Sequence, residues 1–320
     1  MTQLQLRTPS RLHFGLLGWG PHFPRQFGGV GLMIDAPGIG LTAEPASSWQ
    51  AEGPLADRAL RVAERLVTAG VELPSARIVV RHAPQEHVGL GVGTQLSLGV
   101  ARLLLRMAGH HEPSAATLAA LCGRGLRSGV GLHGFGRGGL IVDGGRRTDD
   151  GIPPLLAHLD FPPEWKVLVI LPEPHAGLHG AAEVQAFAQL PPIPVDEADR
   201  LCRLVLMGLM PAVLERDLPT FGMALAELQE RVGRCFAPAQ GGIFARPELT
   251  GIVKGLESEG LHGAGQSSWG PTLYAFSNES DGRRSQILDA LRERFSLPEG
   301  SAFWTSVSER GAILKAADGG

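Results

Sequence analysis

The chain contains a glycine-rich segment at Val88–Gln95, VGLGVGTQ, that leads directly into the apolar run LSLGVARLLLRM. Glycines occupy the alternate positions 89, 91 and 93, and the apolar residues that follow recur at helical spacing. A helix N-terminus carries unpaired backbone N–H groups and the positive end of the helix dipole, so a glycine loop that opens a helix can wrap closely around an anion. We therefore predict a phosphate site here, with Thr94 and Gln95 as side-chain donors.

A lone glycine loop fits a tight strand-to-helix connection about as well as an anion site. The pattern lacks the lysine of a P-loop, and its third glycine comes too early for a dinucleotide fingerprint. Two further glycine-rich segments, Ser128–Gly139 and Gly263–Pro271, favour the anion site, because each glycine has an entropic cost that a plain connection need not incur. The side chains of Gln266, Ser267 and Ser268 add neutral donors to the last segment.

Length, charge and cysteine content narrow the class of protein. With 320 residues the chain can form two domains, and its formal net charge of −3 provides no positive field for nucleic acid. No signal peptide or membrane-length apolar run is evident, so we expect a cytoplasmic protein. The cysteines at positions 122, 202 and 235 are odd in number and far apart, which indicates neither a disulfide framework nor a zinc site.

The hydrophobic pattern predicts an α+β fold with domains at residues 1–160 and 161–320. Helices and strands alternate without the regular rhythm of a doubly wound sheet. A glycine- and proline-rich loop is expected to follow the first strand as far as about Gly40, and residues 153–165 are expected to form a linker. Strands are predicted at 2–8, 77–82, 139–143, 166–171, 272–276 and 302–307, and helices at 57–69, 96–107, 114–124, 197–215, 219–232, 247–258 and 283–295.

The order of these glycine segments resembles that of the GHMP kinase superfamily. The resemblance implies an S5-domain-2-like N-terminal domain and a ferredoxin-like C-terminal domain. Within the superfamily, Arg11–Leu16 (RLHFGL), Arg25–Leu32 (RQFGGVGL) and Gly89–Gln95 are similar to motifs of the β-ribofuranosylaminobenzene 5'-phosphate synthases. The similarity covers most of the chain, including ERDLPTFGMALAELQ at residues 215–229.

Two departures from the kinase pattern weaken a kinase interpretation. Superfamily kinases usually carry GLGSSA, whose serine helps to hold magnesium, whereas Val92 and Gly93 occupy the two serine positions here. The position of the catalytic aspartate in many of those kinases falls on Gly131. Since some superfamily kinases work without that aspartate, an ATP-dependent small-molecule kinase stays open as the alternative function, as does a non-catalytic ligand-binding protein.

The synthase resemblance implies a decarboxylating phosphoribosyl transferase. It would condense 5-phosphoribosyl 1-diphosphate with 4-aminobenzoate or 4-hydroxybenzoate to a C-riboside, with release of CO2 and diphosphate, in tetrahydromethanopterin biosynthesis. Mg²⁺ is expected because the departing diphosphate needs charge neutralisation, and a homodimer is implied by the family. The choice between the two benzoates is left open by the sequence.

Candidate site residues come from the glycine-rich segments and their neighbours. Arg11, Arg25 and His133 are the candidate catalytic residues, because guanidinium forks clamp phosphate or carboxylate and His133 lies among glycines. Asp35 and Glu183 are candidate metal ligands, although each equally suits an ordinary surface carboxylate. Trp269 suits either stacking on the aromatic acid or a core position, and the spacing of His175 and His179 is better explained by a surface loop than by a metal site. The candidate substrate- and phosphate-binding residues are His13, Gly28, Gly29, Gly89, Gly91, Gly93, Thr94, Gln95, Gly265, Gln266, Ser267, Ser268 and Trp269.

Overall fold

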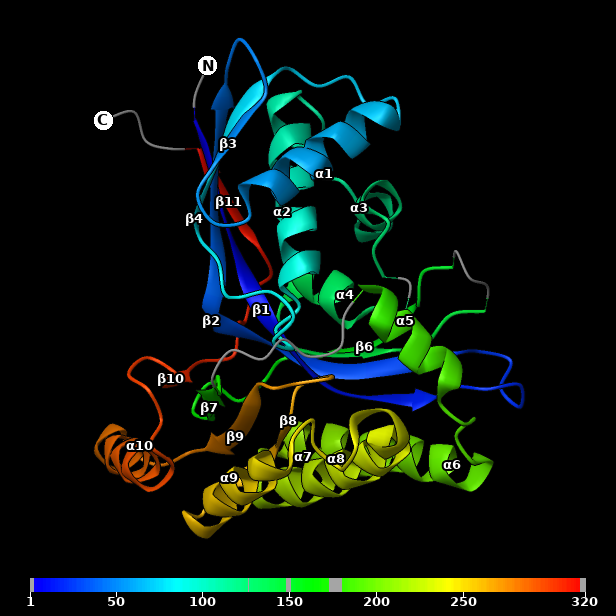
Figure 1. Ribbon diagram of the computed structural model, residues 1–320, viewed down its shortest axis with the longest axis vertical. Coiled ribbons are helices and arrows are strands. Elements are labelled where there is room, and N and C mark those ends of the chain that lie inside the picture. The colour runs from blue at the N-terminus through cyan, green and yellow to red at the C-terminus, as the bar shows by residue number, and fades with distance from the viewer. Residues whose placement is uncertain (1–2, 126, 148–150, 173–179, 317–320) are drawn as a thin grey trace.

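Two long antiparallel strands, β1 (Leu4–Gly18) and β2 (Phe27–Pro45), form the centre of the larger of two sheets. The computed structural model describes residues 3–125, 127–147, 151–172 and 180–316 (Figure 1). In this part of the chain, the larger sheet has the order β11-β1-β2-β4-β3, with β5 and β6 extending from β2. Its remaining strands are β3 (Gln50–Glu52), β4 (Ala76–His82), β5 (Leu140–Asp143), β6 (Leu155–Leu159) and β11 (Ile313–Ala316).

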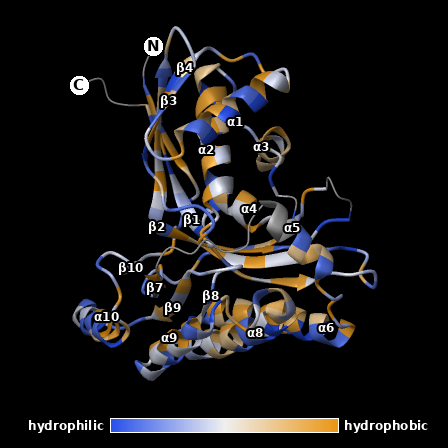
Figure 2. Ribbon diagram, viewed as in Figure 1, coloured by the Kyte–Doolittle hydropathy of each residue, from blue (hydrophilic) through white to orange (hydrophobic). Residues whose placement is uncertain are grey.

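Helices cover one face of this sheet (Figure 1). Helix α2 (Val92–Met107) packs against β1 and β2, because nearly every side of it is apolar. Helix α1 (Ala56–Thr68) is amphipathic and buries one stripe that includes Val62 and Leu66. The other helices here are α3 (Ala115–Cys122) and α4 (Val130–Arg137). Figure 2 shows hydrophobic residues along α2 and the adjoining strands, where the core lies.

The second sheet has the order β10-β7-β9-β8 and lies beside the ends of β1 and β2 (Figure 1). Its strands are β7 (Lys166–Ile170), β8 (His262–Gln266), β9 (Leu273–Ser277) and β10 (Ala302–Thr305). The long helix α8 (Leu218–Gln240) packs on both β8 and β1, so it joins the two halves. The accompanying helices are α5 (Gly180–Gln189), α6 (Val195–Leu204), a π-helical turn at Val205–Leu209, α7 (Met210–Glu215), α9 (Pro247–Ser258) and α10 (Asp281–Phe295). None of the described helices is long and apolar enough to cross a bilayer.

The predicted loop up to Gly40 is wrong, since most of it belongs to β1 and β2. Glycine suits β2 because neighbours approach its backbone closely: a Cβ on Gly31 would lie 2.3 Å from the carbonyl oxygen of Leu12 and 2.9 Å from a methyl carbon of Val130. Glycine content therefore reflects close packing in this strand and not a turn.

Other predicted boundaries also shift. The expected linker contains β6, which pairs with β5, and most of the Ser128–Gly139 segment is the helix α4. The helix predicted at 219–232 extends to Gln240, and the one predicted at 197–215 is interrupted by the π-helical turn. The strand β11 pairs with β1, so residues 313–316 belong to the first sheet.

Candidate functional site

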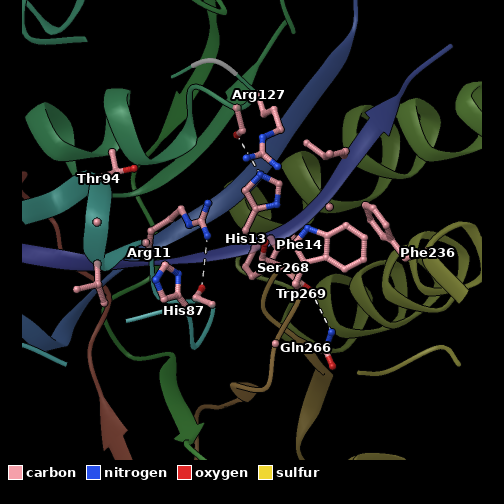
Figure 3. A pocket seen from close by; sticks show the side chains of 18 of the residues that line it. Arg11, His13, Phe14, His87, Thr94, Arg127, Phe236, Gln266, Ser268 and Trp269 are labelled. Carbon is pink, nitrogen blue, oxygen red and sulfur yellow. Dashed lines mark hydrogen bonds between the residues drawn. The ribbon is translucent and has the colours of Figure 1, made fainter. Parts of the chain in front are cut away.

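A cavity of about 430 Å³ lies where the first sheet, the N-terminus of α2 and helix α8 meet. Strand β1 contributes Arg11 and His13, which project from the same face because side chains alternate along a strand. A register shift follows directly at His13 and Gly15, and such bulges re-aim side chains. Figure 3 shows the His13 ring between Arg11 and Trp269, with Arg127 close to it.

One side of the cavity is cationic. We call this side the polar wall, which consists of Arg11, Arg58, Arg124, Arg127 and the N-terminus of α2. Glu86 is the single carboxylate in the described lining, and it is ion-paired with Arg58. Burial, and then repulsion from Arg58, lowers the pKa of the Arg124 guanidinium. Among the described lining residues, guanidinium groups outnumber carboxylates, which suits an anionic ligand.

The predicted glycine loop does open a helix at this wall. Gly91 is the residue before α2 and has a φ of 70°, a left-handed conformation that glycine adopts without strain. A Cβ on Gly89 would lie 2.3 Å from the Ser267 carbonyl oxygen, and the Ser267 hydroxyl donates to the Gly89 carbonyl oxygen at 2.6 Å. Glycine at position 89 therefore lets residues from the two halves of the chain meet beside the cavity.

Another part of the lining is apolar, and we call Phe187, Phe236 and Trp269 the aromatic wall. The rings of Phe236 and Trp269 have centroids 4.6 Å apart, and those of Phe187 and Trp269 are 5.3 Å apart. The Arg127 guanidinium lies 5.1 Å from the centroid of Phe187, where a cation interacts favourably with a ring face. An elongated ligand with an anionic part and a flat apolar part would match both walls.

A hydrogen-bonded chain of three side chains leads from the cavity into the protein. His13 Nε2 lies 3.0 Å from Ser128 Oγ, which donates to Asp143 Oδ2 at 3.0 Å. Backbone N–H groups of Gly129 and Gly145 also donate to the Asp143 carboxylate, at 2.8 and 3.0 Å. Burial and the nearby Arg11 charge lower the pKa of His13 well below 6.5, whereas burial raises the pKa of Asp143.

The structure brings many of the sequence-predicted residues together. The predicted residues that line the cavity are Arg11, His13, Gly89, Gly91, Gly93, Thr94, Gln266, Ser268 and Trp269. Gln95 lies just behind the lining and donates to the Gly131 carbonyl oxygen at 2.8 Å. Ser267 is also behind the lining and ties β1 to the glycine loop, and a Cβ on Gly265 would clash with Gln229.

Several predicted residues lie outside the cavity lining. Arg25 donates to the carbonyl oxygens of Gly144 and Gly145 at 2.7 and 2.9 Å, so its guanidinium fastens a hairpin. His133 Nε2 lies 2.8 Å from the Pro153 carbonyl oxygen. Neither side chain is placed to touch a ligand in this cavity.

The two glycines near Arg25 also serve packing. Gly28 has a φ of 71°, which favours glycine. A Cβ on Gly29 would lie 2.3 Å from Ser128 Oγ and 2.5 Å from Asp143 Oδ2. Gly29 therefore makes room for the hydrogen-bonded chain and does not itself line the cavity.

Neither predicted metal ligand belongs to the described cavity lining. Asp35 is exposed and lines a separate hollow with Lys166, and the Glu183 side chain, like His175 and His179, lies outside the described residues. Across the described part of the chain, no three His, Cys, Asp or Glu side chains gather into a metal-binding group. The described cavity residues therefore do not form a protein cage for Mg²⁺.

Sequence patterns alone do not reveal much of the polar and aromatic walls. Arg124 and Arg127 stand in GRGLRSG, where arginines among glycines could have signalled an anion site, and Asp143 ends an apolar strand. Arg58, Phe187 and Phe236 lie on the helices α1, α5 and α8, and no local sequence pattern marks them as lining a cavity.

The two sheets, their helices and the glycine loop at α2 have the arrangement of the GHMP kinase fold. A sequence model described as GHMP kinases C terminal matches residues 209–297. Homoserine kinase from Cytophaga hutchinsonii superposes with a TM-score of 0.67 at 17% identity, covering 98% of each chain. Mevalonate diphosphate decarboxylase from Staphylococcus aureus does so with a TM-score of 0.63 at 12% identity, again covering 98% of each chain.

Similar sequences place the chain more narrowly. A Methanothermobacter thermautotrophicus protein named beta-ribofuranosylphenol 5'-phosphate synthase is 33% identical over 334 residues, covering 98% of both chains. A protein of the same name from Archaeoglobus fulgidus is 35% identical, covering 92% of this chain and 93% of its own. The chain belongs to the beta-ribofuranosylphenol 5'-phosphate synthase family.

Proposed function

We propose that the protein is a decarboxylating phosphoribosyl transferase that makes a β-ribofuranosyl C-riboside 5'-phosphate. Its substrates are 5-phosphoribosyl 1-diphosphate and a para-substituted benzoate, 4-hydroxybenzoate or 4-aminobenzoate. The bond from the anomeric carbon to diphosphate breaks, and the ring carbon that bears the carboxylate bonds to the anomeric carbon. Loss of CO2 then returns an electron pair to the ring and restores aromaticity. Tetrahydromethanopterin biosynthesis is the pathway that we propose for the product.

The observation that carries this function is the pairing of the two walls around one cavity. The ribosyl donor bears two phosphate-containing groups, and the described lining contains four guanidinium groups and one carboxylate. The benzoate ring is flat and apolar, which suits Phe187, Phe236 and Trp269. Backbone N–H groups at the start of α2 add a further site for a phosphate oxygen.

The position of Gly131 favours this transferase over a kinase. A Cβ there would lie 3.6 Å from both Arg11 Cδ and Thr94 Cγ2, which is ordinary contact distance. A longer acidic side chain would therefore point toward the cavity beside Arg11, yet glycine supplies no carboxylate. Val92 and Gly93 likewise offer no hydroxyl where superfamily kinases usually carry serine.

The test is release of labelled CO2. Purified protein would be incubated with Mg²⁺, 5-phosphoribosyl 1-diphosphate and carboxyl-labelled 4-hydroxybenzoate or 4-aminobenzoate, and the C-riboside would be identified by mass spectrometry. Release that requires the ribosyl donor and not ATP is expected. No release with either acid, together with ATP consumption on a panel of small alcohols, would overturn the transferase in favour of a kinase.

Magnesium and self-association are parts of the same proposal. Mg²⁺ would enter with the diphosphate, because it commonly binds through substrate phosphates and water and needs few protein ligands. Chelation should abolish product formation and added Mg²⁺ should restore it. We also propose a homodimer, which sedimentation velocity of the purified protein would distinguish from a monomer.

A further inference from the structure

Ser128 stands in the middle of the chain of His13, Ser128 and Asp143, and its hydroxyl uses all of its hydrogen-bonding capacity. Ser128 Oγ also accepts from the Val130 backbone N–H at 3.2 Å, so this hydroxyl has one bond to donate and two to accept. When Asp143 is ionised, Ser128 donates to it, and His13 must carry its proton on Nε2 to satisfy Ser128. The lone pair of the neutral imidazole is then on Nδ1.

A second proton arrangement fits the same heavy-atom positions. If Asp143 carries the proton on Oδ2, it donates to Ser128, and Ser128 donates to His13 Nε2. The imidazole proton is then on Nδ1. The two arrangements differ by one proton taken up at Nδ1 and passed through Ser128 to Asp143, with every hydrogen bond kept.

The two ends of the chain differ in their position relative to the cavity. Asp143 and His13 are both buried, at 0% and 5% exposed, but only His13 and Ser128 line the cavity. Within the part of the chain that the structure describes, Nδ1 of His13 has no hydrogen-bonding partner. The backbone N–H of Ser268 donates to the His13 carbonyl oxygen at 3.0 Å, which holds His13 next to Trp269 of the aromatic wall.

We infer that His13, Ser128 and Asp143 form a proton relay that transiently takes the proton of the para hydroxyl or amino group of the aromatic substrate. As the ring carbon bonds to the anomeric carbon and diphosphate leaves, the para proton moves to His13 Nδ1, the Nε2 proton to Ser128, and the Ser128 proton to Asp143. When the carboxylate leaves as CO2 and its electron pair restores the aromatic ring, the protons return. No proton is gained or lost overall.

The electrostatics of the site agree with a relay that avoids an imidazolium ion. Burial and Arg11 disfavour positive charge on His13, and burial favours the protonated form of Asp143. A neutral His13 also adds no positive charge near the developing ribosyl cation. His13 is thus a catalytic residue, and Ser128 and Asp143 act through it.

The test compares two substrates, because the inference rests on the proposed function. In 3,5-difluoro-4-hydroxybenzoate, fluorine makes the hydroxyl more acidic, so a pH exists at which this substrate is ionised and 4-hydroxybenzoate is not. At that pH, His13→Gln should lower kcat with 4-hydroxybenzoate by about 100-fold or more, the usual range for general acid–base catalysis. The loss should be under about 10-fold with the ionised substrate, which has no proton to give.

Two further variants complete the test. Ser128→Ala should show a smaller loss with the same substrate dependence, a readout that a merely structural role would not change. His110→Gln, an exposed histidine after α2, is the matched control and should show no loss. Thermal unfolding would check that each variant is folded. Equal losses with both substrates in His13→Gln and Ser128→Ala would overturn the relay, whereas an inactive wild type would overturn the proposed function itself.

Discussion

The two walls of the cavity differ in how the chain builds them. The polar wall comes mainly from segments before residue 130, in which glycines bring backbone and arginines close together. The aromatic wall comes from Phe187, Phe236 and Trp269, which are far apart in sequence and meet through α5, α8 and the turn after β8. The first half of the chain therefore builds the polar wall and the second half builds the aromatic wall, so the cavity between them forms only when the two halves pack together.

Among variants of the two walls, we expect the largest change in KM at the polar wall. Arg124→Gln should raise KM for 5-phosphoribosyl 1-diphosphate by about 10-fold to 100-fold, since a hydrogen bond to a charged group contributes about 1.5–3 kcal/mol. KM for the benzoate should change little. Steady-state kinetics with each substrate varied in turn would measure both constants.

The variant Arg25→Gln tests whether Arg25 only fastens a hairpin, as its contacts indicate, or takes part in the site, as the sequence motif predicts. Its guanidinium binds Gly144 and Gly145 carbonyl oxygens outside the cavity lining, so KM for the ribosyl donor should stay within about 2-fold of wild type. A rise as large as that of Arg124→Gln would return Arg25 to the site and show that the donor extends beyond this cavity.

A smaller effect is expected at the aromatic wall. Phe236→Leu keeps most of the apolar volume but removes a ring contact worth about 0.5–1.5 kcal/mol, so KM for the benzoate should rise by about 2-fold to 10-fold. KM for the ribosyl donor should not follow. A change confined to the donor would mean that the aromatic ring binds elsewhere.

The smallest expected effect is on the pH dependence of stability. Because the pKa of His13 is lowered from 6.5 in the folded protein, the unfolded chain takes up this proton first, and the folded state loses stability as pH falls below that value. Asp143 acts in the opposite sense, since its raised pKa makes the folded state take up the proton first. Thermal unfolding between about pH 7 and about pH 5 should therefore show a smaller loss of Tm in His13→Gln than in wild type.

Sequence patterns located the glycine loop at α2 and several cavity residues, because helix-opening glycines and arginine-containing motifs are local signals. Arg25, His133 and Asp35, which the same patterns indicated, lie outside the cavity lining, where their side chains face carbonyl oxygens or a separate hollow. The patterns also took β2 for a loop. Its glycines are explained by contacts with Leu12 and Val130, which lie on other elements and leave no mark in the local sequence.

The sequence by itself determined the helix-opening loop, the α+β class and a family resemblance that similar proteins bear out. Each depends on residues close together in the chain, where periodicity and backbone preference act directly. Only the tertiary structure decided that four arginines face three aromatic rings, and that His13 meets Ser128 and Asp143. The His13–Ser128 contact joins positions 115 residues apart, and the two walls come from different halves of the chain, so local sequence patterns do not determine either arrangement.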